Sequence, residues 1–145
     1  MSAPHLIVAE PPPAYAVRPP VVADCSLLCA IVFDEPERAT ALQWLAGRSV
    51  HAPEMLAHEV ANVALKKRKR GWPADAVLTA LSDFQQLPID LHATDLPGQF
   101  TLAEQYGLSA YDAAYLWLAS ALKAPLATFD RKLGEVAQVH LRGLE

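Results

Sequence analysis

Four carboxylic acids lie far apart along the chain: Asp24, Glu59, Asp112 and Asp130. Carboxylates that gather raise one another's pKa and destabilise a fold, unless a cation offsets their charge. Oxygen-only ligands favour hard cations such as Mg²⁺ or Mn²⁺, and no set of cysteines and histidines with ligand spacing competes with the acids. Such a cation can activate a water and stabilise charge on a scissile phosphate. The four acids predict a metal site for phosphodiester hydrolysis, provided that the fold brings them together.

Each acid taken alone also has a structural explanation. Asp112 follows Ser109 by three residues, as in a capping box at the start of a helix. Asp130 could cap a helix or form a turn, and Asp24 could simply end a strand. Glu59 could pair with a cation further along its own helix. The sequence leaves these alternatives open for each single residue.

The elements that would position the acids follow from the hydrophobic pattern. Short apolar runs without polar alternation are typical of buried parallel strands, and proline or glycine bounds several of them. Strands are predicted over residues 21–24, 49–52, 89–91 and 125–128, with a last short one within 136–141.

Helices are predicted between these strands. They cover residues 26–33, a segment opened by 34–37 that runs through Trp44, and then 53–70, 73–86, 94–106 and 109–122. Alternating strands and helices predict an α/β fold with a parallel sheet covered on both faces. Ligands of such sheets lie beyond the carboxyl ends of the strands. Asp24 ends the first predicted strand, Asp130 follows the fourth, and the other two acids lie in early helix turns.

Length and composition suit a single domain. The chain has 145 residues, of which 52% are hydrophobic, and a net charge of −4, whereas proteins that coat nucleic acid are usually basic. Residues 1–19 are rich in proline and are predicted to form a flexible tail, leaving 20–145 as the folded domain. No apolar run approaches a membrane span. Cys25 and Cys29 are interpreted as reduced, buried thiols of a cytoplasmic protein.

Five consecutive cations end the helix that carries Glu59. They could face the negative end of the helix dipole, or they could contact the phosphates of a nucleic acid, and the sequence favours neither reading. The candidate nucleic-acid-binding residues are Lys66, Lys67, Arg68, Lys69 and Arg70.

Four segments, taken in order, carry a family resemblance: VVADCSLLCAIVFDEPE, APEMLAHEVANVALKK, YGLSAYDAAYLWLASAL and APLATFDRKL. Together they resemble PIN-domain proteins, specifically VapC-type toxin ribonucleases, over residues 21–141. The resemblance implies a three-layer α/β/α sandwich with a central parallel sheet. It also implies that Asp24, Glu59, Asp112 and Asp130 bind Mg²⁺, for which Mn²⁺ can substitute.

The resemblance further implies an endoribonuclease that hydrolyses RNA with a metal-activated water. Ser26 and Thr128 match small hydroxyl positions that support the first and last acids in the family. As the toxin of a type II toxin–antitoxin system, such a chain is expected to bind a VapB-type antitoxin and to form a homodimer. The alternatives are a PIN nuclease of RNA processing and a catalytically inactive module that binds RNA or protein.

Overall fold

Four parallel strands form one sheet in the order β3-β2-β1-β4. The structure is a computed structural model that describes residues 6–7 and 18–144, so most of the predicted proline-rich tail lies outside the described residues. The strands are β1 (Pro20–Ala23), β2 (Ser49–Pro53), β3 (Ile89–His92) and β4 (Leu126–Ala127). The predicted parallel sheet is therefore confirmed, with strand ends that differ by at most one residue from the sequence pattern.

Strand β1 lies inside the sheet and sets the position of Asp24. Val22 pairs with His51 of β2 on one side and with Leu126 of β4 on the other. The β1 residues Val21, Val22 and Ala23 have no exposed surface. Because both faces of the strand are covered, all of these side chains are apolar and the strand shows no polar alternation. Asp24 follows directly, at the carboxyl end of the sheet.

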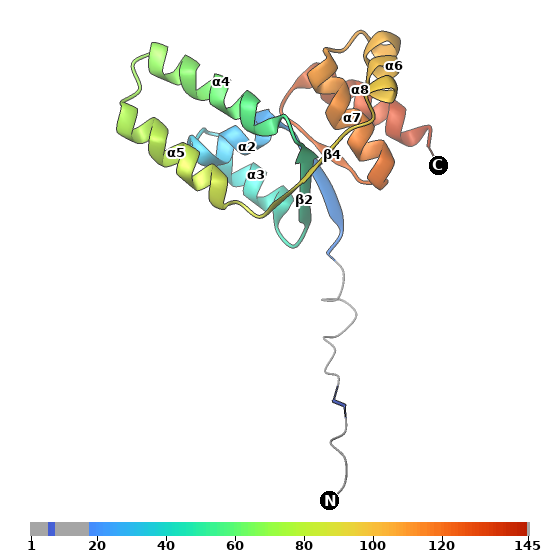
Figure 1. The fold of residues 1–145 in the computed structure, drawn as a ribbon, viewed down its shortest axis with the longest axis horizontal. Helices are drawn as coiled ribbons and strands as arrows, with labels where there is room; N and C mark the ends of the chain where they lie inside the picture. Colours follow the sequence, from blue (N-terminus) through green and yellow to red (C-terminus); the bar gives the residue numbers. More distant parts are fainter. Residues whose placement is uncertain (1–5, 8–17, 145) are drawn as a thin grey trace, which may run out of the picture.

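Helices cover both faces of the sheet, as Figure 1 shows. One layer, on the left of Figure 1, holds α2 (Cys25–Val32), α3 (Arg38–Leu45), α4 (Leu56–Lys69) and α5 (Ala74–Gln86). The other holds α6 (Leu96–Tyr106), α7 (Ala110–Leu122) and α8 (Arg131–Arg142). This three-layer α/β/α sandwich is the predicted architecture. None of the helices in the described part of the chain is both long and apolar enough to span a membrane.

Helix α7 is the centre of its layer and contacts β1, β2 and β4. Ser109 caps it, accepting a hydrogen bond at 3.1 Å from the amide of Asp112. Ala113 and Ala114 are fully buried, and their small side chains let the helix approach its neighbours closely. The first turn of α7, with Asp112, thus has a fixed position relative to the sheet.

The short strand predicted within 136–141 is wrong, because these residues belong to α8. Asp130 caps this helix through the amide of Leu133 at 2.9 Å. Leu133 and Ala137 are buried and Leu141 packs against the core, so the apolar positions recur every four residues. That spacing fits a helix and not the alternation of a strand.

The two predicted helix starts that differ most from the structure are those at 34–37 and at 53. The helix expected to open at 34–37 begins at Arg38, and Asp34 has a positive φ of 50° that no helix residue adopts. Pro53 ends β2 instead of opening α4, which begins at Leu56. Both differences move a boundary and leave the order of elements unchanged.

Candidate functional site

The four predicted acids line one cleft of about 450 Å³, called here the acidic cleft. Asp24 comes from the end of β1, Glu59 from α4, Asp112 from α7, and Asp130 from the loop between β4 and α8. Ser26 also lines the acidic cleft. The fold thus brings together residues that lie up to 106 positions apart in the chain.

Asp24 is the most enclosed of the four acids, with 5% of its surface exposed. Its Oδ1 accepts hydrogen bonds from Ser26 Oγ at 2.7 Å and from the amide of Leu27 at 3.1 Å. Its Oδ2 accepts one from Thr128 Oγ1 at 2.5 Å. Burial raises the pKa of Asp24, and the three hydrogen bonds oppose that rise because they favour the ionised form. These donors hold the carboxylate in one orientation.

The two hydroxyls that hold Asp24 also fix the loop that carries Asp130. Ser26 Oγ accepts from the amide of Phe129 at 3.0 Å, and Thr128 Oγ1 accepts from the amide of Asp130 at 2.9 Å. Each hydroxyl therefore donates to the Asp24 carboxylate and accepts from the β4–α8 loop. The first and last acids of the site are positioned by the same pair of side chains.

Glu59 lies half-buried in α4 and accepts a hydrogen bond from Tyr115 Oη, at 2.7 Å from its Oε1. Burial raises the pKa of Glu59, Tyr115 lowers it, and the charges of Asp112 and Asp24 raise it further. Tyr115 is 1% exposed, and its sequence context predicts only a packing role. Its position one turn after Asp112, on the same side of α7, is the sequence signal that could have indicated a contact with the site.

Asp112 and Asp130 form the other side of the acidic cleft. Burial raises the pKa of Asp112, the charges of Asp130 and Asp24 add to that rise, and Ser109 and Lys132 oppose it. Asp130 is exposed and caps α8 through its Oδ1, as described above. The capping role predicted for Asp130 is therefore present together with the convergence of the four acids on one cleft, whereas Asp112 takes part in the cap of α7 through its backbone amide.

Two further acids, Glu35 and Glu37, line the acidic cleft and were not singled out by the sequence pattern. Glu35 Oε1 pairs with Lys67 Nζ at 3.1 Å. The same ammonium lies 5.4 Å from the ring centre of Phe33 and 4.8 Å from that of Trp72. Lys67 is therefore held between two aromatic rings and a carboxylate. Through Glu35 it connects the basic run to the wall of the acidic cleft.

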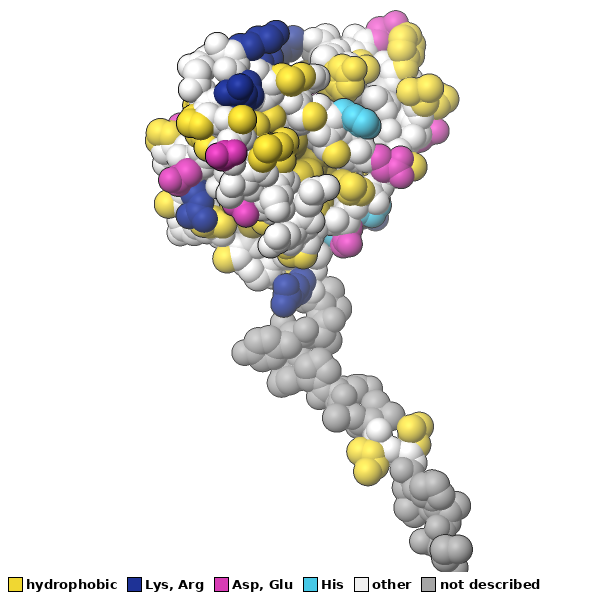
Figure 2. All heavy atoms as spheres, turned by 60° about the vertical axis from the view of Figure 1, so that its left-hand side comes forward, with side chains coloured by type: hydrophobic (Ala, Val, Ile, Leu, Met, Phe, Trp, Pro, Cys, Tyr) yellow, Lys and Arg dark blue, Asp and Glu magenta, His cyan; other side chains and the backbone are white. Residues whose placement is uncertain are grey.

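The rest of the basic run does not line the acidic cleft. Arg68 donates to the carbonyl of Trp72 at 2.7 Å. Lys66, Lys69 and Arg70 are exposed at the end of α4. On the face that Figure 2 turns forward, Lys and Arg side chains gather along the upper edge, the side on which Figure 1 draws the turn from α4 to α5. The exposed cations could meet a polyanion that extends beyond the cleft.

The donor set of the acidic cleft fits a hard divalent cation. Its carboxylate and hydroxyl oxygens suit Mg²⁺ or Mn²⁺. Within residues 6–7 and 18–144, no three His, Cys, Asp or Glu side chains stand close enough to enclose an ion by themselves. Mg²⁺ commonly keeps several waters and binds one or two carboxylates together with substrate phosphates, so an open arrangement suits it. Burial is the main cause of the raised pKa values of Asp24, Glu59 and Asp112, and the charges of neighbouring acids add to it. A bound cation would stabilise the ionised form of all three.

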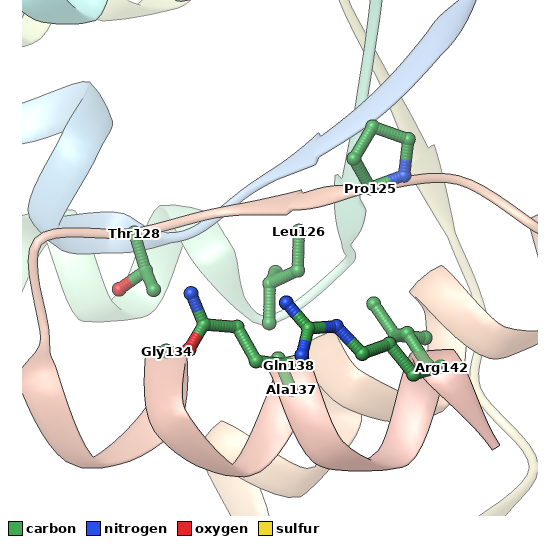
Figure 3. A pocket seen from close by; sticks show the side chains of 8 residues that line it. Pro125, Leu126, Thr128, Gly134, Ala137, Gln138 and Arg142 are labelled. Atoms are coloured by element: carbon green, nitrogen blue, oxygen red, sulfur yellow. The ribbon is translucent and has the colours of Figure 1, made fainter.

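A second hollow, of about 400 Å³, lies between β4 and α8, and Figure 3 shows Gln138 and Arg142 on its helical side. Thr128 lies at one end of it. None of the four acids lines this hollow, and its charged lining residue is the cation Arg142. It is therefore not a candidate for a metal site.

The chain matches the PIN domain family over residues 21–139. It is 32% identical over 121 residues to "Ribonuclease VapC3" from Pyrobaculum aerophilum, an alignment that covers 79% of this chain and 92% of that protein. The crystal structure of PAE2754 from Pyrobaculum aerophilum has the same fold, with a TM-score of 0.67 and 20% identity. That match covers 88% of this chain and 90% of the other. The chain therefore belongs to the PIN-domain family, and its likeness to VapC3 puts it among the VapC-type members.

Proposed function

We propose that this protein is an Mg²⁺-dependent endoribonuclease, with Mn²⁺ as a substitute, and the toxin of a type II toxin–antitoxin pair. The observation that carries the proposal is the convergence of Asp24, Glu59, Asp112 and Asp130 on one cleft. The name of the related VapC3, a ribonuclease, supports RNA as the substrate. Hydrolysis of a phosphodiester needs positive charge at the phosphate, which an acidic cleft provides only through a cation.

The residues of the acidic cleft have separate roles in this proposal. Asp24, Asp112 and Asp130 hold the divalent cation, and Glu59 contributes directly or through a water. When bound, the cation supplies positive charge to the scissile phosphate and makes a water more acidic. Tyr115 occupies Glu59 Oε1, which leaves Oε2 to accept a hydrogen bond from a water.

A covalent route through a thiolate is disfavoured by the state of Cys25. Its thiol lies 3.6 Å from that of Cys29, and this contact, together with burial, raises the pKa of Cys25. A thiol is a weak nucleophile in its protonated form, so the attacking group is a water. The two free thiols also support our proposal that the protein acts in the reducing environment of the cytoplasm.

A VapB-type antitoxin is the proposed inhibitor, and we propose that the toxin itself is a homodimer. Phe129, 40% exposed, lines both the acidic cleft and a neighbouring apolar hollow that includes Trp44, 51% exposed. A peptide with apolar anchors and a cationic end could fill the hollow and reach the acids at the same time. Such a segment would keep RNA out of the acidic cleft.

The proposal is tested by incubating total RNA with the protein in Mn²⁺ or in EDTA and mapping the cut sites. Cleavage is expected in Mn²⁺ alone, and Asp24→Asn is expected to remove it. Asp83→Asn changes an exposed acid on α5, outside the acidic cleft, and serves as the matched control with full activity. Equal cleavage by folded Asp24→Asn and by the wild type would refute the proposed site.

The toxin role needs a separate experiment in cells. Expression of the wild type is expected to arrest growth, and expression of Asp24→Asn is not. Growth should recover when a cognate antitoxin is co-expressed. An RNA-processing nuclease would cleave RNA in the first experiment without arresting growth in the second.

A further inference from the structure

Another hollow, of about 420 Å³ and separate from the one between β4 and α8, lies at the same edge of the sheet as the acidic cleft. It lies where β2 ends at Pro53 and β3 ends at His92, whereas the acidic cleft lies at the ends of β1 and β4. Neighbouring strands are about 4.8 Å apart, so the two hollows are separated by roughly the width of one or two strands. An extended polymer bound at the acids would continue along this edge.

Two elements connect this hollow to the acidic cleft. Tyr111 lines the hollow and the next residue, Asp112, lines the acidic cleft. Met55 lines the hollow, and its carbonyl accepts a hydrogen bond at 3.2 Å from the amide of Glu59, which lines the cleft. A ligand that fills the hollow therefore lies next to one held by the four acids.

The lining of the hollow combines an aromatic ring with polar groups. Tyr111 is 59% exposed, and among the described residues no side chain hydrogen-bonds to its hydroxyl or to the carboxylate of Glu54. The amide of Glu54 donates to the carbonyl of His92 at 2.9 Å, which keeps the two residues side by side. The His92 ring is itself fixed by His51, whose Nδ1 lies 2.8 Å from His92 Nε2.

We infer that this hollow binds the base of the nucleotide next to the scissile phosphate, with Tyr111 as the stacking surface. The inference rests on the proposed ribonuclease function and adds a base preference to it. Single-stranded RNA is recognised by stacking unpaired bases on aromatic rings and by hydrogen bonds to their edges. A carboxylate accepts hydrogen bonds from exocyclic amino groups, so Glu54 favours cytosine, adenine or guanine over uracil.

The test uses RNA oligonucleotides that contain one mapped cleavage site and differ only in the bases on either side of the cut. At the position beside the cut where the wild type shows a base preference, uracil is expected to give a higher KM than cytosine, adenine or guanine. Tyr111→Ala should raise KM for the preferred oligonucleotide about 5- to 100-fold. Tyr111→Phe keeps the ring, so its KM should stay close to that of the wild type. Glu54→Gln should reduce the discrimination against uracil, because an amide offers a donor as well as an acceptor.

Two exposed residues on α6, outside the hollow, provide matched controls. Phe100 is 63% exposed and Glu104 is also exposed, so Phe100→Ala and Glu104→Gln are expected to leave KM and the base preference unchanged. The inference is overturned if Tyr111→Ala and Glu54→Gln behave like these controls while the wild type cleaves RNA.

A binding measurement separates failure of the inference from failure of the proposed function. If the wild type cleaves no RNA, the proposed function fails, and the base site is then tested by fluorescence anisotropy with single-stranded RNA oligonucleotides that carry each base in turn at one position. Weaker binding by Tyr111→Ala than by Phe100→Ala would support the base site. Equal binding by the two variants, or no binding by the wild type, would overturn it.

Discussion

The hydroxyl of Tyr115 donates a hydrogen bond to Glu59 Oε1 across 2.7 Å and so joins α7 to α4 in the core beside the acidic cleft. Asp112 lies on the same helix as Tyr115, one turn earlier. The contact therefore sets the position of Glu59 relative to a second acid. Contacts of this kind, which orient a metal-binding carboxylate, typically change metal affinity 10- to 100-fold when they are removed.

Tyr115→Phe is expected to weaken Mn²⁺ activation of RNA cleavage about 10-fold or more. Because the Tyr115 hydrogen bond lowers the pKa of Glu59, its loss should move the acidic limb of the pH–rate profile to higher pH. The measurement is cleavage rate against Mn²⁺ concentration and pH. Tyr106→Phe, which removes a hydroxyl bonded to His140 at 2.8 Å, is the control and should leave both curves in place. Identical Mn²⁺ and pH curves for the two variants would contradict a positioning role for Tyr115.

Thr128→Val is expected to disturb Asp24 and Asp130 together. It removes the donor to Asp24 Oδ2 and the acceptor for the Asp130 amide while keeping the volume of the side chain. The free energy of unfolding should fall by about 1–3 kcal/mol, since polar groups are left without a partner, and cleavage should slow. Urea unfolding and an RNA cleavage assay measure the two effects.

The matched change Thr101→Val removes an exposed hydroxyl on α6 that bonds only to a carbonyl of its own helix. It should leave cleavage unchanged. A Thr128→Val variant that is as stable and as active as Thr101→Val would show that the shared hydroxyl does not position the acids.

Asp112→Asn is expected to stabilise the metal-free protein at neutral pH. Burial and then the charges of Asp130 and Asp24 raise the pKa of Asp112, so the folded state holds the Asp112 proton more tightly than the unfolded state does. Stability from this group is therefore lost as pH rises from its unfolded value, about 3.9, through the raised folded value. The variant should be more stable than the wild type at pH 7 in EDTA, and the difference should vanish near pH 4. A loss of stability at pH 7 would contradict this repulsion.

The exposed part of the basic run is expected to contribute to RNA binding through counterion release. Lys66→Gln with Lys69→Gln should reduce the slope of log affinity against log salt by about 1.4, because each contact with single-stranded RNA contributes about 0.7. Lys123→Gln with Arg142→Gln, at the ends of α7 and α8, is the control pair. The slope is measured with all substitutions made in the Asp24→Asn protein, so that the bound RNA is not cleaved. If the Lys66→Gln and Lys69→Gln substitutions leave the slope unchanged, the run has a purely structural role.

Lys67 shows why the sequence alone could not tell which cations of the basic run are exposed and which are held by contacts within the fold. Five adjacent cations look equivalent in the sequence, but Lys67 lies between the rings of Phe33 and Trp72 and pairs with Glu35, which is 32 residues away. Substitution of Lys67 would disturb this packing as well as any contact with RNA. The distinction depends on tertiary contacts that have no local signal.

The order of strands and helices could be predicted because each element has its own hydrophobic pattern. The last strand was predicted wrongly because Val136 to Leu141 is a short stretch in which strand and helix patterns are hard to separate. The sequence predicts Asp130 either as a site residue or as a helix cap, and the structure shows that it caps α8.

Four acids could be singled out from the sequence because two lie at strand ends and two in early helix turns, in an order that resembles one family. Tyr115 was not singled out, because a tyrosine on an apolar helix most often packs in the core. Its spacing from Asp112 indicates the side of the helix on which it lies but not its partner Glu59, which is 56 residues away. Glu35 and Glu37 were not singled out because acids just before a helix are common. A pattern of residue types along the chain does not show which residues from distant segments contact each other in the fold.

The central claim is that the four carboxylates of the acidic cleft act together on a divalent cation. Calorimetric titration of Mn²⁺ into the wild type, Asp24→Asn, Asp112→Asn and the control Asp83→Asn tests it most directly. The account predicts binding by the wild type and by Asp83→Asn, and binding that is at least 10-fold weaker in each of the two cleft variants. Equal Mn²⁺ binding by all four proteins, or none by the wild type, would contradict it.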